Sequence, residues 1–211
     1  MNKLLDGFQF IFRGGFMMLP LLASSLIALT VIVERWVVLN MQYVTPDDFI
    51  RNVLENVKKG KVTEACGICG KKSIPVAAVL NEGIAHFASP IEEMEIAMKN
   101  EGESWVPLLE KRIHVLDTTI TIAPLMGLLG TIMGMMGSFK VLTNSGMNDP
   151  YSITGGIAEA LIATATGLVI ALVCVIANNY FNTLVKNNIY EMESAASRLL
   201  EARMASERRH K

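Results

Sequence analysis

The stretch GGIAEALIATATGLVIALVCVIANNYF, residues 155–181, decides the fold. A helix needs about 20 predominantly apolar residues to cross the hydrocarbon core of a bilayer, and this stretch supplies them. One carboxylate, Glu159, lies near its start. An ionised carboxylate facing lipid costs several kcal/mol, so Glu159 must face protein or water, be neutral, or pair with a cation.

The composition of the whole chain agrees with a membrane protein. Of its 211 residues, 51% are hydrophobic and 18% are charged, which is unusual for a soluble protein. The formal net charge of −1 gives no basic excess of the kind that holds a phosphate backbone, so nucleic acid is not an expected partner. Residues 16–36 and 118–140 are apolar enough to form two more spans. The predicted fold class is an all-α membrane protein with three transmembrane helices and cytoplasmic helical extensions.

Lysine and arginine predict the orientation, because cytoplasmic flanks carry the excess. More than half of the 19 fall within residues 35–112, and most of the others follow residue 186. We expect the N-terminus outside and the C-terminus inside. The predicted order is a short outer segment (1–15), a first span retained as an anchor (16–36), a cytoplasmic helical domain (37–117), a second span (118–140), an outer loop (141–153), a third span (154–181) and a cytoplasmic C-terminal helix (182–211).

Local signals predict helices in the cytoplasmic segment. Thr45 is an expected N-cap, and Ser89 and Glu92 have the spacing of a capping box. Gly60 is an expected C-cap. Pro107 is predicted to bend or interrupt a helix that runs toward the second span.

Three cysteines are too few for a disulfide framework. Cys66 and Cys69 form a CxxC motif that could bind a metal or do redox chemistry, but no second CxxC and no histidine pair accompanies it. We favour two small residues on one helix turn, and we expect Cys174 to pack as a small hydrophobe. No cofactor is implied.

An enzyme is not favoured. His86, His114 and His210 are scattered, and the sequence holds no Ser/His/Asp or phosphate-loop pattern.

The second span contains a face of glycines. Gly127, Gly130, Gly134 and Gly137 recur at steps of three or four, which places them on one side of a helix. In lipid, small residues let helix backbones approach closely, so we predict packing. Pro124 frees a backbone carbonyl, and this predicts a kink facing protein.

Polar residues inside the spans are candidates for function. Thr131 lies near the middle of the second span, where its hydroxyl either bonds its own helix backbone or lines a wet path; backbone bonding is favoured. In the third span Glu159 and Thr166 share a face, whereas Thr164 lies roughly 140° away. Glu159 is either a network residue at the outer edge or a member of a proton or ion pathway.

On these residues the chain resembles the MotA/TolQ/ExbB family of proton-channel subunits, most closely the ExbB and TolQ branch. The resemblance rests on GGFMMLPLLASSLIALTVIVERW in the first span, APLMGLLGTIMGMMGSF in the second, and GGIAEALIATATGLVIAL followed by NNYF in the third. The family pattern has a proline in the second half of the third span, where this chain has ALVCV around Val173.

The resemblance implies a homo-pentamer in the bacterial inner membrane, around two helices of an ExbD- or TolR-type single-span subunit. Such complexes use proton flow to do mechanical work on a TonB- or TolA-like envelope protein. Thr131 and Thr164 would match the threonines that line the central path, and Glu159 the intramembrane glutamate. The essential titrating aspartate would belong to the partner. The alternative function is a non-conducting membrane scaffold that assembles and stabilises partner proteins.

Overall fold

The computed structural model describes residues 15–42, 47–145 and 150–210. These residues form helices and no strand, so the all-α prediction is confirmed. The expected N-cap Thr45 lies outside the described residues. The elements are α2 (Met18–Val37), the π-helical turn η1 (Val38–Gln42), α3 (Asp47–Lys58), α4 (Val62–Cys69), α5 (Pro75–Ala85), α6 (Ile91–Leu109), α7 (Ile113–Ser145) and α8 (Pro150–His210).

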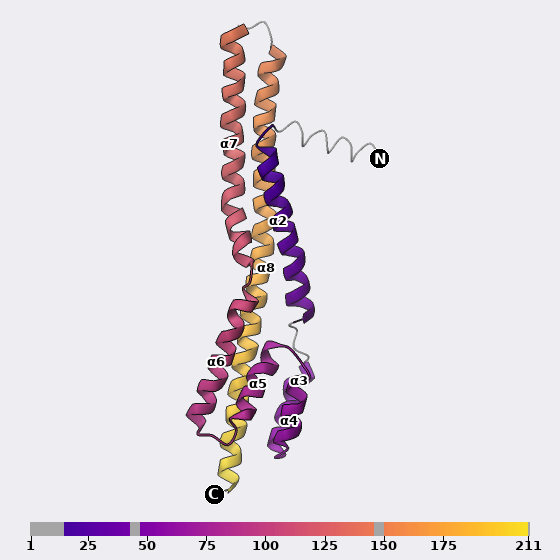
Figure 1. The fold of residues 1–211 in the computed structure, drawn as a ribbon, viewed down its shortest axis with the longest axis vertical. Helices are drawn as coiled ribbons and strands as arrows, with labels where there is room; N and C mark the ends of the chain where they lie inside the picture. Colours follow the sequence, from indigo (N-terminus) through magenta and orange to yellow (C-terminus); the bar gives the residue numbers. More distant parts are fainter. Residues whose placement is uncertain (1–14, 43–46, 146–149, 211) are drawn as a thin grey trace, which may run out of the picture. The chain divides into compact units, whose positions relative to one another are not determined.

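The chain divides into two compact units, and α2 and α8 each contribute residues to both of them. Unit 1 consists of Met1–Val33 and Arg112–Asn179, and unit 2 of Glu34–Lys111 and Tyr180–Lys211. Unit 1 therefore holds most of α2, all of α7 and the first half of α8 (Figure 1). Unit 2 holds the four shorter helices α3 to α6 and the second half of α8.

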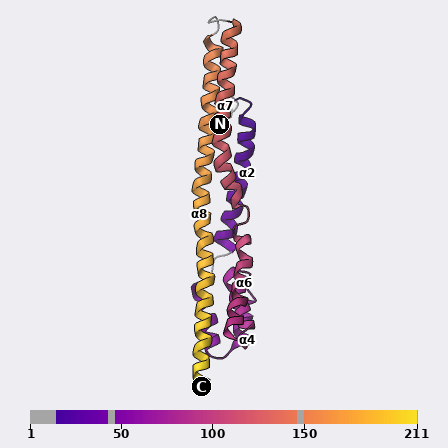
Figure 2. The ribbon, with the colours of Figure 1, turned by 90° about the vertical axis from the view of Figure 1, so that its left-hand side faces the viewer.

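In unit 1, α7 and α8 run side by side in opposite directions, and α2 lies against them (Figures 1 and 2). A small apolar core joins the three helices. Met18 and Leu21 of α2 pack against Ala123 of α7, with Met126 and Ile170 at the edge of the cluster.

Long apolar helices carry the three predicted spans. Among the described residues, Met18–Asn40, Ile91–Thr143 and Ile153–Ser206 each contain a helical stretch long and apolar enough to cross a membrane. Many large apolar side chains in them are exposed, among them Met133, Met135 and Met136 on α7 at 44%, 44% and 66%. Lipid or other subunits can cover such surfaces. The exact ends of the spans stay predictions.

Unit 2 has its own core, in which α3 packs on α4, α4 on α5, and α5 on α6. Gly83 of α5 marks a close approach, because an added Cβ would overlap the side chains of Met98 and Leu199. Arg35, at the end of α2, is buried. Its guanidinium donates to the carbonyl of Leu108 at 3.4 Å and pairs with Glu34 at 3.1 Å. It thus satisfies one of the carbonyls that the last turn of α6 leaves open.

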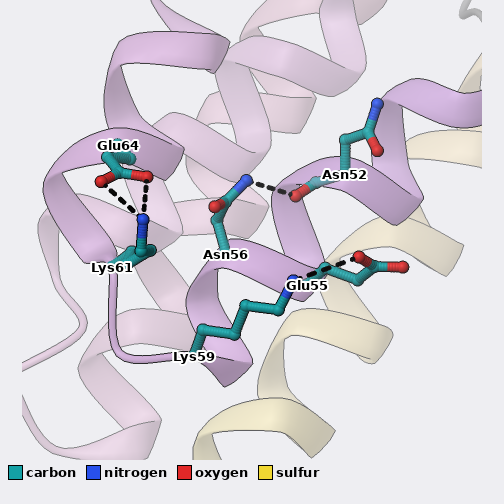
Figure 3. A network of polar contacts seen from close by, with 6 residues as sticks. All are labelled: Asn52, Glu55, Asn56, Lys59, Lys61 and Glu64. Atoms are coloured by element: carbon teal, nitrogen blue, oxygen red, sulfur yellow. Dashed lines mark hydrogen bonds and ion pairs between the residues drawn. The ribbon is translucent and has the colours of Figure 1, made fainter.

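Gly60 ends α3 as predicted. Its φ is +77°, its amide donates to the carbonyl of Val57, and the amide of Lys61 donates to that of Asn56. This is the Schellman pattern, which favours glycine at the left-handed position. Exposed polar contacts flank the turn, between Lys59 and Glu55 at 3.6 Å, Lys61 and Glu64 at 2.9 Å, and Asn56 and the Asn52 carbonyl at 2.8 Å (Figure 3).

The expected capping box at the start of α6 is wrong. Pro90 itself occupies the N-cap with ψ 148°, and no side chain caps the helix. Ser89 therefore lies one residue too early for its hydroxyl to reach the first turn. Pro107 lies inside α6, which continues to Leu109 before residues 110–112 interrupt the helical path, so the interruption follows the proline.

Candidate functional site

Small residues bring α7 and α8 into backbone contact. A Cβ at Gly127 would lie 3.0 Å from the carbonyl oxygen of Ala163, and a Cβ at Gly134 would lie 2.8 Å from that of Gly156. Gly130 is as tightly enclosed, by the Cβ of Ala163. Any larger side chain here would push the helices apart.

The face of α8 that packs against α7 supplies the matching small residues, a pattern that we did not predict from the sequence. Gly156, Ala160, Ala163 and Gly167 are spaced by four, three and four residues, so they share one helical face. A Cβ at Gly167 would overlap the carbonyl oxygen of Ala123. The stripes of small residues on α7 and α8 therefore fit together. The stripe on α8 could have been found in the sequence, because glycine and alanine recur there with the period of a helix.

Gly137 differs from the other three glycines of α7. Nothing lies within 4 Å of its Cβ position, so it makes no such contact with the described residues. It lines a cavity of about 340 Å³ instead. The lining residues are Phe16, Met17, Gly130, Met133, Gly134, Gly137, Ser138, Val141, Gly156 and Glu159.

Glu159 brings a carboxylate to this cavity. The side chain is half-buried and comes from α8, and its end lies against the backbone of Gly15, just before α2. Within the described part of the chain, no hydrogen bond or ion pair to this carboxylate is present, and Lys140 and Arg35 do not reach it. Glu159 therefore faces protein and open space, one of the arrangements that its sequence position allowed.

Ser138 lines the same cavity as Glu159, and we did not single it out from the sequence. It is buried, and its hydroxyl lies 3.2 Å from the carbonyl oxygen of Gly134 and 3.0 Å from that of Ile153. The second contact crosses from α7 to α8, so Ser138 fixes the two helices at the wall of the cavity.

The two candidate pathway threonines both bond to backbone. Thr131 donates to the carbonyl of Leu128 in its own helix at 2.6 Å. Thr164 donates to the carbonyl of Gly127 on α7 at 2.9 Å, so this hydrogen bond joins α8 to α7. Thr166 bonds its own helix at the carbonyl of Ile162. The structure thus places Glu159 at the cavity and both candidate threonines outside its lining.

A second polar pair joins α7 and α8 and was also missed. The buried amide of Asn178 donates to the carboxylate of Asp117 at 2.6 Å. The two partners are 61 positions apart in the sequence, so local sequence patterns do not reveal this contact. The kink expected at Pro124 stays a prediction, although Pro124 does lie within α7.

The CxxC motif forms part of an ordinary helix turn in unit 2. Cys66 and Cys69 both lie in α4, and the thiol of Cys66 donates to the side-chain oxygen of Asn81 at 3.2 Å. Burial, with a smaller contribution from Cys66, raises the pKa of the Cys69 thiol to about 12. Such a thiol is a poor metal ligand and nucleophile. No group of three or more His, Cys, Asp or Glu side chains that could hold a metal occurs among the described residues.

A family model described as the MotA/TolQ/ExbB proton channel family matches residues 71–194. The chain belongs to this family. The match includes α7 and the part of α8 that carries Glu159, which are the elements of the site described above. The chain is therefore a membrane protein of a proton-channel family, and the ExbB/TolQ resemblance read from its spans is confirmed.

The relatives that the chain resembles include both ExbB-type and TolQ-type proteins. The chain is 30% identical over 173 residues to an ExbB-like biopolymer transport protein of Synechocystis, covering 81% of this chain and 82% of the relative. It is 42% identical over 86 residues to the Tol-Pal system protein TolQ of Haemophilus influenzae, covering 41% of this chain and 36% of the relative. It is 34% identical over 86 residues to the biopolymer transport protein ExbB of Aquifex aeolicus, covering 41% and 58%.

Proposed function

We propose that this chain is the channel-forming stator subunit of an inner-membrane complex. With an ExbD/TolR-type single-span partner, it converts proton-motive force into mechanical work on a TonB- or TolA-like envelope protein. One observation supports this most: in a chain of a proton-channel family, the half-buried carboxylate of Glu159 lines an open cavity beside the α7–α8 pair. Intramembrane carboxylates that face a cavity are typical of ion and proton pathways.

In this proposal a proton enters from outside past Glu159 and neutralises an aspartate on the partner helix. The neutral aspartate can pass an apolar wall, and the proton then leaves inward past Thr131 and Thr164. A threonine suits such a wall because its hydroxyl both donates and accepts hydrogen bonds without holding a charge. One charge that crosses 100 mV releases about 2.3 kcal/mol, so a few protons can drive a conformational step.

The assembly is part of the same proposal. We infer a homo-pentamer around a dimer of the partner, with the N-terminus outside and the C-terminus inside. The exposed apolar side chains of the three spans support association with other helices and lipid. The excess of lysine and arginine in residues 35–112 and after residue 186 supports the orientation.

A second candidate function is a non-conducting scaffold. The hydroxyls of Thr131 and Thr164 are both bonded to backbone carbonyls, and this favours a purely structural role for them. Both proposals need the same tight α7–α8 packing, so packing does not distinguish them.

Substitution of Thr164 separates channel from scaffold. Thr164→Val keeps the shape of the side chain and removes its hydroxyl, and Thr164→Ser keeps the hydroxyl as the matched control. The measurement is proton uptake by liposomes that contain this chain and its ExbD/TolR-type partner. For a channel we expect uptake to fall on the order of 100-fold in Thr164→Val, the lower end of what removal of a proton-transfer group costs. Thr131→Val should act in the same way.

Unchanged uptake in both valine variants, with assembly intact, would remove the threonines from the pathway, whereas the scaffold predicts no partner-dependent uptake even by the parent chain. For the carboxylate, Glu159→Gln keeps most hydrogen bonding and removes the charge. If Glu159 takes part in proton transfer, uptake falls in this variant. Full activity would make it a structural residue.

A further inference from the structure

We propose that Gly15 is a positioning residue for Glu159: the side chain that it lacks leaves the space in which the carboxylate lies. This inference concerns where the carboxylate is held. Its consequence for transport rests on the proposed function.

The geometry of Gly15 carries the proposal. A Cβ added at this residue would overlap the carboxylate of Glu159 and would lie only 3.0 Å from its Cγ. The φ of Gly15 is +71°, a left-handed conformation that residues with a side chain rarely adopt. The backbone and the missing side chain therefore both favour glycine at this residue.

The same residue begins the first span. The carbonyl of Gly15 accepts a hydrogen bond from the amide of Met18, the first residue of α2, at 3.0 Å. The next two residues, Phe16 and Met17, line the cavity together with Glu159. The start of α2 is thereby fixed against the carboxylate, so a side chain on α8 is held by a turn that comes 144 residues earlier in the sequence.

Gly15→Ala should displace the carboxylate and leave the fold in place. The end of a glutamate side chain can rotate away from a new methyl group, and the adjoining cavity of about 340 Å³ has room for it. The carboxylate then lies in open space away from the backbone of Gly15. We expect it to become more accessible to reagents and less well placed for proton transfer.

Two other glycines provide matched controls. Gly60→Ala introduces the same backbone strain, since its φ is +77°, but nothing lies within 4 Å of its Cβ position. Gly137→Ala places a methyl group in the same cavity, again with nothing within 4 Å. Gly60→Ala therefore tests the effect of backbone strain alone, and Gly137→Ala tests the effect of a methyl group in the cavity wall alone.

The first measurement does not depend on transport. Each full-length variant in lipid nanodiscs is treated with the hydrophobic reagent dicyclohexylcarbodiimide, and mass spectrometry gives the fraction of Glu159 that is modified. We expect this fraction to rise in Gly15→Ala and to match the parent chain in Gly60→Ala and Gly137→Ala. Equal modification in Gly15→Ala and the parent, or an equal rise in Gly60→Ala, would overturn the proposal.

The second measurement is partner-dependent proton uptake in liposomes. We expect a loss on the order of tenfold in Gly15→Ala, since misplacing a reacting group by about 1 Å can cost up to ~100-fold. Adding Glu159→Asp, which withdraws the carboxylate by one methylene, should restore part of the uptake. Increased modification with full uptake would support the positioning of Glu159 and contradict its place in the pathway, so the two proposals fail separately.

A Gly15→Ala chain that does not fold still gives a result. If the overlap with Glu159 is the cause, Glu159→Ala in the same chain removes the overlapping atoms and should restore expression and thermal stability. Failure to restore them would show that backbone strain alone is responsible, and would overturn the proposal.

Discussion

At the scale of single residues, the thiol of Cys69 shows how burial controls reactivity. Cys69 is only 1% exposed, and its pKa is raised to about 12, mainly by burial. Because only the thiolate reacts, we expect Cys69 to resist a maleimide at pH 7 in the folded protein, and to react after denaturation. Peptide mass spectrometry on Cys66→Ser/Cys174→Ser measures this. Rapid labelling of Cys69 in the folded chain would contradict its burial.

The raised pKa of Cys69 also makes the free energy of unfolding depend on pH. The ordinary pKa of the thiol is 9.0, so between about pH 9 and 12 the unfolded chain loses the proton and the folded chain keeps it. The contribution of Cys69 to stability is therefore complete below pH 9 and falls as pH rises. We expect thermal stability to fall less steeply with pH over this range in Cys69→Ser. Parallel curves for Cys69→Ser and the parent would contradict the raised pKa.

The contact between Asp117 and Asn178 is a pair whose energy can be measured. The amide nitrogen lies 2.6 Å from the carboxylate. A hydrogen bond to a charged group contributes about 1.5–3 kcal/mol. A double-mutant cycle with Asp117→Ala and Asn178→Ala, from unfolding in mixed micelles, should give a coupling free energy of about 2 kcal/mol. Additive single effects would mean that the bond contributes nothing to stability.

At the scale of helices, the α7–α8 contact depends on the absence of side chains. Gly134→Ala would bring a Cβ within 2.8 Å of the carbonyl oxygen of Gly156 and within 2.9 Å of the Cβ of Ala160. Overpacking of this kind costs about 1–3 kcal/mol, so we expect a lower unfolding temperature in detergent. Gly137→Ala, with nothing within 4 Å, is the matched control. Equal losses in the two variants would show that the spacing of the helices is not set at Gly134.

Local sequence signals predicted helices better than their exact ends. Gly60 could be read in advance because a left-handed C-terminal residue favours glycine whatever surrounds it. Ser89 could not, because its spacing to Glu92 does not show whether Pro90 takes the N-cap or the first helical position. In α8 the interior is free of proline, and the helix continues from the third span to the C-terminal region as the pattern predicted.

At the scale of the whole molecule, the distribution of charge predicts how the chain crosses the membrane. In a chain whose three cysteines are replaced by alanine, Lys140→Cys should react with a membrane-impermeant maleimide in intact spheroplasts. Tyr190→Cys, at a side chain that is 71% exposed, should react only after permeabilisation. Both expectations follow from the excess of lysine and arginine inside. The reverse pattern would invert the proposed orientation.

The candidate site was predictable in its parts but not in its assembly. Hydropathy was enough to mark the spans, and an acidic residue in an apolar run was enough to single out Glu159. The contact of Glu159 with Gly15 and the bond of Thr164 to Gly127 join residues far apart in the chain. Such contacts depend on how the helices pack, and a single sequence holds no periodic signal for them.

The exposed methionines of α7 have a chemical consequence. Met133, Met135 and Met136 are exposed side chains on an apolar helix, and Met133 also lines the cavity of Glu159. Oxidants convert a thioether to a sulfoxide, which is polar and forms strong hydrogen bonds. Three sulfoxides within one turn would make part of the second span unfavourable in lipid and in contacts with apolar neighbours. Peroxide would thus change the exposed side of the second span, and methionine sulfoxide reductases would be the enzymes that reverse the damage.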